Sequence, residues 1–127
     1  MAKKFISLMN HKLTEKQLKD AQSFNGEQLE VVELQSELVN PHASTEEVYA
    51  QAERILSQLP PDTKYVNIMG DFGMTVAIVA LLKSGRYGQV TPVYATTHRQ
   101  AQEVRNPDGS ITKTSVFNHV QFRAYLL

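Results

Sequence analysis

Short apolar runs alternate with longer amphipathic segments through the first three quarters of the chain. The runs are typical of buried strands, and the segments between them place apolar residues on one helical face. The pattern predicts strands at 4–9, 29–34, 65–69 and 89–94 and helices at 14–26, 44–59 and 74–82. Because helices separate the short strands, we expect an α/β fold with a mainly parallel sheet of about four strands flanked by helices.

Local signals mark the beginnings of the first two helices and the end of the first. Thr14 with Gln17, and Ser44 with Glu47, follow the pattern of a capping box, in which two side chains satisfy backbone N–H groups reciprocally. The Asn-Gly pair at 25–26 is typical of a helix C-terminus. We therefore expect the first helix to end at this pair.

A glycine turn separates the third predicted strand from a helix that is apolar all round. Gly70 and Gly73 flank Asp71 and Phe72, and the apolar segment 74–82 follows at once. A strand, a glycine turn and a helix start are where α/β proteins place backbone N–H groups against an anion or a nucleotide. Alternatively, the glycines only allow a tight turn and Asp71 caps the helix. Such an apolar helix should be covered on a second side, for which a partner subunit is one candidate.

The last third of the chain changes character. The turn residues at 105–110 predict a hairpin between segments 100–104 and 111–116. The final stretch fits a helix almost as well as a strand, and we favour the strand. Such a strand places side chains alternately on two faces: Val116, Val120, Phe122, Ala124 and Leu126 on one, and His119, Gln121 and Arg123 on the other.

Composition indicates one globular domain spanning residues 1–127. Of the 127 residues, 42% are hydrophobic and 20% are charged, which is the balance of a folded globular protein rather than of a disordered chain. No apolar run is long enough to span a membrane, and the N-terminus leads directly into a strand, so we expect a cytoplasmic protein that is not exported. With no cysteine and four scattered histidines, we expect no disulfide, no metal site and no cofactor.

The net charge is zero, but the two halves differ in sign. Residues 1–63 carry six Lys/Arg against ten Asp/Glu, and residues 64–127 carry seven against three. A neutral chain is a poor partner for long nucleic acid, which requires the release of many counterions. The basic half suits a small polyanion held in one local pocket, and two solvated faces of opposite sign are the alternative explanation.

Polar groups follow three of the predicted strands. Asn10 and His11 follow the first, the glycine turn follows the third, and Thr96, Thr97 and Arg99 follow the fourth. Because the carboxyl ends of parallel strands meet at one edge of a sheet, we expect these groups to form a three-sided pocket for a phosphate-bearing ligand. Less specific roles are also open. His11 could occupy a polar turn, the threonines could cap the next element, Arg99 could pair with Glu103, and His119 could lie at a sheet edge.

With these residues assembled, the chain resembles a small family of standalone CRISPR-associated proteins of type III systems. These proteins are related to the CARF sensor domains, which bind cyclic oligoadenylate. The matching segments are Asn10-His11-x-Leu13-Thr14, Gly70-Asp71-Phe72-Gly73, Tyr94-Ala95-Thr96-Thr97-x-Arg99 and Phe117-x-His119-Val120-x-Phe122-Arg123-x-Tyr125. They extend from one end of the chain to the other.

The resemblance implies a Rossmann-like, CARF-like domain with a C-terminal antiparallel extension, acting as a homodimer. It also implies ring-nuclease activity. Such an enzyme binds cyclic oligoadenylate, with cyclic tetra-adenylate favoured, and cleaves it without a metal by attack of the ribose 2′-hydroxyl, which switches off type III CRISPR signalling. The catalytic candidates are His11, Arg99, His119 and Arg123, and the ligand-binding candidates are Asn10, Gly70, Asp71, Phe72, Gly73, Thr96 and Thr97.

Two alternatives remain open at this point. The chain could sequester cyclic oligoadenylate without cleaving it, because a binder and a slow nuclease need the same phosphate contacts. The resemblance could also mislead, in which case the chain is a structural or nucleotide-binding α/β domain.

Overall fold

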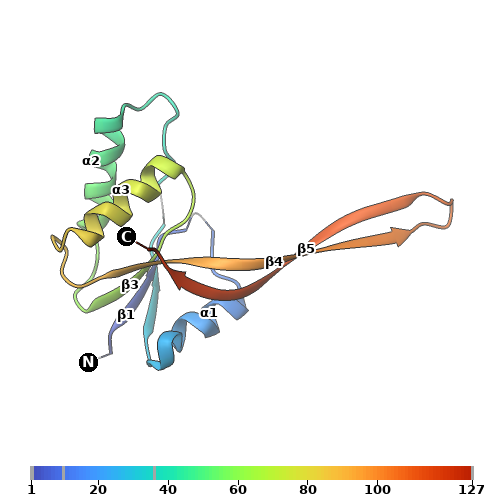
Figure 1. The fold of residues 1–127 in the computed structure, drawn as a ribbon, viewed down its shortest axis with the longest axis horizontal. Helices are drawn as coiled ribbons and strands as arrows, with labels where there is room; N and C mark the ends of the chain where they lie inside the picture. The colour runs from blue at the N-terminus through green and yellow to red at the C-terminus, as the bar shows by residue number, and fades with distance from the viewer. Residues whose placement is uncertain (1, 10, 36, 127) are drawn as a thin grey trace.

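The computed structural model describes residues 2–9, 11–35 and 37–126, which form a five-stranded mixed sheet with three α-helices (Figure 1). The strands are β1 (Lys4–Ser7), β2 (Glu30–Glu33), β3 (Thr63–Asn67), β4 (Thr91–Arg105) and β5 (Ile111–Ala124). The helices are α1 (Glu15–Gln22), α2 (Thr45–Leu56) and α3 (Phe72–Lys83). The strand order is β2-β1-β3-β4-β5. The first four strands pair in parallel, and β5 pairs antiparallel with β4.

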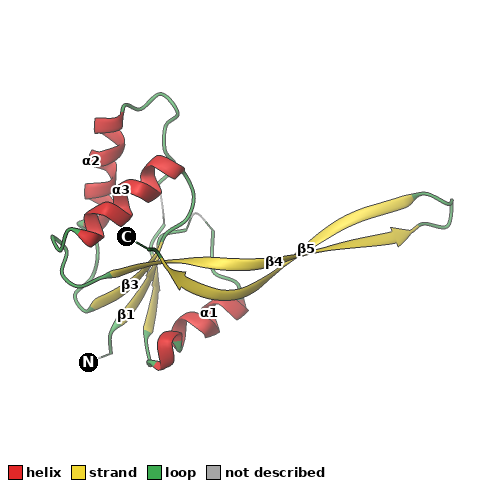
Figure 2. Ribbon diagram, viewed as in Figure 1, coloured by secondary structure: helices red, strands yellow, loops and turns green. Residues whose placement is uncertain are grey.

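Helices cover both faces of the sheet (Figure 2). One hydrophobic core lies between the sheet and α2 and α3, and it includes Ile6, Ile55 and Ile78. A smaller core lies between the sheet and α1, and it includes Phe5 and Phe122. Connections from β1 and β3 lead to opposite sides of the sheet, so the strand order reverses between them. In open α/β sheets this point of reversal, at the carboxyl ends of the strands, is where ligands bind.

The capping signals predicted the helix starts correctly, but α1 is shorter than expected. Thr14 and Ser44 each accept a hydrogen bond from a backbone N–H of the first turn, and both capping boxes are complete. However, α1 ends at Gln22, and a 3₁₀ turn (Phe24–Gly26) follows, with Asn25 at a φ of 59°. The helix therefore ends at the cap residue Ser23, about one turn before the predicted pair, and Phe24 in the 3₁₀ turn packs edge-on against Phe5.

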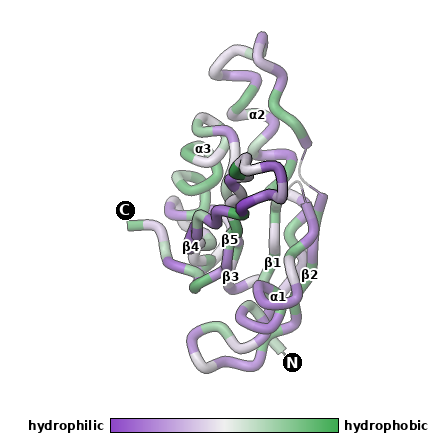
Figure 3. Tube along the Cα trace, turned by 90° about the vertical axis from the view of Figure 1, so that its right-hand side faces the viewer, coloured by the Kyte–Doolittle hydropathy of each residue, from purple (hydrophilic) through white to green (hydrophobic). Residues whose placement is uncertain are grey.

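Helix α3 is as apolar as expected, and Figure 3 shows it as a largely hydrophobic coil. Met74, Ile78 and Leu82 are buried against the sheet and α2. The second side is open, since 89% of Phe72 and 68% of Val76 are exposed in this chain. Among the described residues, no helix has the length and apolar character needed to cross a membrane.

Strand β4 does not end near residue 94, as the sequence had suggested. It continues to Arg105 and pairs with β5 throughout, so the predicted hairpin is correct but much longer. Beyond the body of the molecule the hairpin is solvated on both faces. Residues 95–102 therefore show no alternation of hydrophobic and polar positions, and the sequence pattern did not predict a strand there. We call residues 97–118 the arm. They project away from the sheet (Figure 1), and all are exposed except the half-buried Asn106.

A β-bulge lies where the arm joins the body, and it overturns the predicted faces of β5. Thr96 pairs with Gln121, but Thr97 pairs with His119, so Val120 is an extra residue in the ladder. The alternation therefore shifts by one position, and His119 falls on the same buried face as Phe122 while Val120 is exposed. The Thr96 Oγ1 lies 3.0 Å from the Gln121 carbonyl oxygen, to which it donates, and 3.3 Å from the Gln121 nitrogen.

Candidate functional site

The carboxyl ends of β1 and β3 carry buried polar side chains at the point where the strand order reverses. Asn67 is 0% exposed, and its Nδ2 donates to the Ser7 Oγ at 3.2 Å and to the Met9 Sδ at 3.0 Å. Its Oδ1 has no hydrogen-bond partner among the described residues. A buried unpaired carbonyl costs about 1–3 kcal/mol, so such a group requires a functional or structural reason. We call residues 8–12 and 68–73, which follow these two strands, the β1–β3 edge.

The glycine turn forms the β3 side of this edge. Gly70 has a φ of 139°, which strongly favours glycine, and Asp71 is the N-cap of α3, its Oδ2 accepting from the Met74 nitrogen at 2.9 Å. The capping role predicted for Asp71 is therefore confirmed. The N–H groups of Phe72 and Gly73 make no hydrogen bond to another described residue. They remain available to an acceptor at the helix N-terminus, where the helix dipole favours negative charge.

His11 lies on the β1 side, on the rim of a hollow of about 330 Å³ that Lys12 and Glu33 also line. Its Nδ1 lies 3.0 Å from the Lys12 carbonyl oxygen. A carbonyl can only accept, so this contact requires the proton on Nδ1. In that tautomer Nε2 is a proton acceptor, and it makes no hydrogen bond to another described residue. His11 is exposed, so a ligand can reach it. Asn10, the other residue predicted here, lies outside the described residues.

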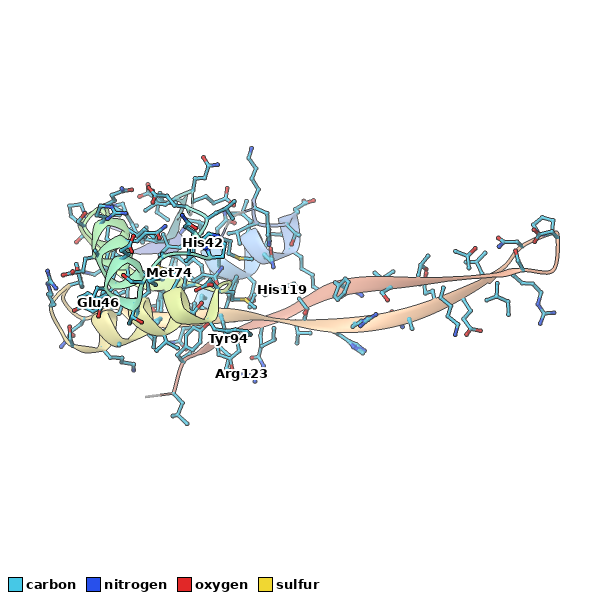
Figure 4. The ribbon with its side chains drawn as sticks, turned by 90° about the horizontal axis from the view of Figure 1, so that it is seen from above. His42, Glu46, Met74, Tyr94, His119 and Arg123 are labelled. Carbon is cyan, nitrogen blue, oxygen red and sulfur yellow. The ribbon has the colours of Figure 1, made fainter. Side chains whose placement is uncertain are left out.

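A chain of contacts through two tyrosines links Arg123 to the β3 side of the edge. Its Nη1 donates to the Tyr94 hydroxyl at 3.3 Å, and its guanidinium lies 5.6 Å from the centre of that ring. Tyr94 packs against Tyr125 at 4.7 Å, and the Tyr125 hydroxyl donates to the Ile68 carbonyl at 2.6 Å. Burial raises the pKa of the Tyr125 hydroxyl, which keeps it a donor. Figure 4 shows Tyr94 and Arg123 next to each other at the base of the arm.

His119 belongs to a different environment from Arg123. Its ring is 5% exposed on the α1 face, 4.8 Å from the Phe122 ring, and its Nε2 lies 2.7 Å from the Asp20 Oδ2. Arg123 lies on the opposite face of β5, because residue 122 between them points toward α1. The contact with Asp20 fastens the base of the arm to α1. The geometry favours this structural role over proton transfer.

The remaining predicted residues lie along the arm rather than at a strand end. Arg99 donates to the Ser115 Oγ at 3.2 and 3.1 Å and lies 5.8 Å from the Phe117 ring centre, so it pairs across the hairpin and not with Glu103. Thr96 is held in the bulge, and Thr97 is exposed. Within one copy of the chain, His11 follows β1 and the glycine turn follows β3, and the two line separate hollows. Arg123 is linked to the β3 side through Tyr94 and Tyr125, and Arg99 lies farther out on the arm.

Sequence reasoning missed Ser7 and Asn67, although both carried a signal. Each is a polar residue inside an otherwise apolar strand, which is the pattern of a buried polar contact between neighbouring strands. It also missed the contact of Asp20 with His119 and the contact of Tyr125 with Ile68, because neither is visible before the strands are aligned.

A larger hollow lies at the other end of the sheet. It has a volume of about 660 Å³ and is lined by Lys3, Asp62 and Lys64 among others. Lys3 and Asp62 pair with each other at 3.8 Å, and the hollow lies at the amino ends of the strands, so it is a poor candidate for the site. Within the described ranges, no group of three or more His, Asp or Glu residues could hold a metal ion.

The comparisons with known proteins identify a family without an assigned activity. A family model described as "Uncharacterized protein MJ1673 family" matches residues 3–123. No curated protein and no solved structure matches the chain.

Proposed function

We propose that this chain, which belongs to the uncharacterized protein MJ1673 family, is a Rossmann-like ring nuclease. It binds cyclic oligoadenylate, with cyclic tetra-adenylate favoured, at the β1–β3 edge of a homodimer and linearises it. The observation that carries the proposal is the set of groups at this edge. These groups are the buried Asn67 carbonyl, the first turn of α3 and the His11 ring. Each lies at or just after the carboxyl end of β1 or β3, and the Asn67 Oδ1 has no partner among the described residues.

These groups suit the chemistry of an adenylate. The first-turn N–H groups of Phe72 and Gly73 can donate to a phosphate oxygen, as helix N-termini do in nucleotide-binding α/β proteins. Arg123 adds a guanidinium that can bind two phosphate oxygens at once. The hydrogen bond to Tyr94 positions the exposed Arg123 side chain, so it loses less conformational entropy on binding than an unconstrained arginine would.

The size of the hollows supports a ligand shared between two copies. The hollow beside His11 measures about 330 Å³, and the one beside the glycine turn only about 70 Å³. Small-molecule sites usually measure about 300–1,000 Å³, so one copy offers room for a single nucleotide rather than for a ring of four. A tetra-adenylate ring has two-fold symmetry, and two identical edges related by a dimer axis match it.

The proposed cleavage needs one proton acceptor and an aligned substrate. The ribose 2′-oxygen forms a bond to the adjacent phosphorus, the bond to the 5′-oxygen breaks, and a 2′,3′-cyclic phosphate remains. In this scheme Nε2 of His11 takes the proton from the 2′-hydroxyl, and the departing 5′-oxygen gains a proton from water. Much of the rate comes from holding the 2′-oxygen in line with the leaving group. Arg123 and the α3 N-terminus stabilise the charge that develops on the phosphate.

A second candidate function is sequestration of the ring without cleavage. The arrangement of His119 and Arg99 favours it, because one is buried against Asp20 and the other pairs across the arm. This leaves His11 as the single imidazole at the β1–β3 edge of one copy. Binding would then lower the free concentration of the ring without changing it chemically.

The test combines ligand binding with product analysis. Purified protein is incubated with cyclic tri-, tetra- or hexa-adenylate, with and without EDTA, and the products are separated by chromatography. Linear products in EDTA support the nuclease, whereas an unchanged ring together with a raised melting temperature supports sequestration. No product and no shift with any ring would refute both functions.

Two variants test the assigned roles. His11→Ala should retain binding and slow cleavage by about 10²–10⁴-fold, the usual contribution of a general base. His42→Ala removes a histidine that lines neither hollow and is the matched control, for which we expect no change. Equal cleavage by His11→Ala and the native chain would exclude His11 as the base.

A further inference from the structure

The arm is a two-stranded ribbon that is exposed along its length and projects from the body of the chain (Figure 1). It continues the β4–β5 ladder for nine residue pairs, from Thr97–His119 to Arg105–Ile111. A hairpin alone in water is at best marginally stable, and ribbons of this length normally pack against another element. Several apolar side chains on it face solvent: Val104 is 51% exposed, Ile111 53%, Val116 38% and Phe117 64%.

The body of the molecule carries a matching apolar groove between α2 and α3. The groove measures about 600 Å³ and is lined by Val48, Tyr49, Phe72, Val76 and Ala77 among others. Tyr49 is 45% exposed in addition to the exposed side chains of Phe72 and Val76. This is the open side of α3, which an apolar helix would be expected to cover.

The exposed apolar surface of the chain is concentrated in these two places. In the described part of the chain, all but three of the large exposed apolar side chains lie on the arm, at its base or in the groove; the exceptions are Leu38, Met69 and Leu126. Soluble monomers rarely expose contiguous apolar patches, and larger ones usually mark contact sites. The arm cannot reach the groove of its own chain, because it leads away from the body (Figure 1).

We propose that the arm of one copy lies in the α2–α3 groove of a second copy, and that the partner's arm does the same in return. Such a reciprocal exchange is a closed two-fold interface, so it stops at a dimer. The inference names the contact that builds the homodimer of the proposed function, but it requires no ligand, and either can fail without the other.

The charges of the two surfaces are complementary. The first turn of α2, beside the groove, carries Glu46 and Glu47, and Figure 4 shows Glu46 on this helix. The arm carries three cations, Arg99, Arg105 and Lys113, against two acidic residues. Because the acidic and basic surfaces come from different parts of the same chain, the exchange brings opposite charges together at both contacts.

Two arms, each seated along its whole length, would supply roughly three quarters of the area that a stable dimer buries on each partner. Nine pairs at about 3.4 Å each give a ribbon roughly 30 Å long, and a ribbon about 10 Å wide presents roughly 300 Å² of projected area on one face. Each copy contributes one arm and one groove, so the projected contact area on each copy is roughly 600 Å². The accessible surface that is buried is larger, because side chains project from both surfaces. Stable interfaces bury about 800 Å² of accessible surface on each partner.

The test measures the mass of the ligand-free protein by size-exclusion chromatography with light scattering. We expect the native chain to have twice the 14.3 kDa mass of one copy. Ile111→Asp in the arm and Val76→Asp in the groove should each give a monomer with unchanged circular dichroism, since both side chains are exposed within one copy. Leu126→Asp alters an apolar residue that is even more exposed and lies outside both surfaces, so this variant should stay dimeric.

Mixing the two monomeric variants provides a sharper criterion. The intact arm of the Val76→Asp copy can enter the intact groove of the Ile111→Asp copy, so the mixture should regain a dimer that neither variant forms alone. A native monomer at all concentrations, a dimer that survives either substitution, or a mixture that stays monomeric would overturn the proposal. If the mass changes as expected but no cyclic oligoadenylate binds, the proposed function fails and the arm exchange stands.

Discussion

The contact between His119 and Asp20 allows a structural role to be separated from a catalytic one. We expect His119→Ala to destabilise the fold strongly, because it removes a buried ring from the junction of the arm, α1 and Phe122. His119→Phe retains the volume of the ring and removes only the hydrogen bond. It should therefore be milder, and it should leave ring cleavage by the folded protein unchanged.

The magnitudes follow from the contacts. A hydrogen bond to a charged group contributes about 1.5–3 kcal/mol, and His119 makes one with a 2.7 Å separation from Asp20. In His119→Phe part of this loss is offset, because the Nδ1 of His119 is buried without a partner among the described residues, so we expect a net cost of about 1–2 kcal/mol. His119→Ala adds a void beside Phe122, which brings its cost to about 3–4 kcal/mol.

The assay is urea or thermal unfolding followed by circular dichroism, as a double-mutant cycle with Asp20→Ala. For a chain of this size 1 kcal/mol corresponds to roughly 3–5 °C in Tm, so His119→Ala should lower the Tm by roughly 10–20 °C. The coupling between His119→Phe and Asp20→Ala should be about 1–2 kcal/mol, well above the roughly 0.5 kcal/mol scatter of independent sites. A coupling within that scatter, or loss of cleavage in His119→Phe at unchanged Tm, would refute the structural assignment.

Three further predictions concern the stability of the fold. The Lys64 ammonium, hydrogen-bonded to Glu27, holds the pKa of the Glu27 carboxyl below its usual range. The stabilisation from this pair is therefore present above the ordinary carboxyl pKa and is lost as the pH falls through the lowered pKa. The Tm difference between the native chain and Glu27→Gln should be clear at neutral pH and vanish in strong acid. Thr96→Val removes the hydroxyl at the bulge and should cost about 1 kcal/mol in urea unfolding, whereas Thr97→Val, at an exposed position, should change stability by less than about 0.5 kcal/mol. Asp71→Ala should cost about 1 kcal/mol through loss of the α3 cap, and Asp71→Asn should restore most of it; equal effects of the two would contradict the capping role.

Much of the body could be predicted from local signals. The capping residues Thr14 and Ser44 located two helix starts, and the apolar runs located the parallel strands, because these features depend on neighbouring residues. The arm could not be predicted to its full length, since a ribbon solvated on both faces has no hydrophobic period for the sequence to show. The bulge was missed for a different reason. The position of His119 depends on how β5 aligns with β4, and no single strand contains that information.

The site was predicted only in outline. His11 follows β1 and the glycine turn follows β3, as the strand pattern indicated, but the two line separate hollows. His119 and Arg123 were placed on one face, and the structure places them on opposite faces. The partnership of Asn67 with Ser7 depends on the pairing of β1 with β3, so it became visible only in the assembled sheet.

The bulge also bears on how the chain folds and on how the arm could be redirected. The turn at Gly109 sets one register along the arm, while the packing of Phe122 in the body sets another, and the two differ by one residue, which Val120 absorbs. A hairpin can close from its turn within microseconds, before the parallel strands assemble, so we expect the two registers to form separately and meet at this residue. Deleting Val120 would leave every residue pair on both sides in place and remove the bend. Because a β-bulge bends the strand that contains it, we expect this one residue to influence the direction of the arm.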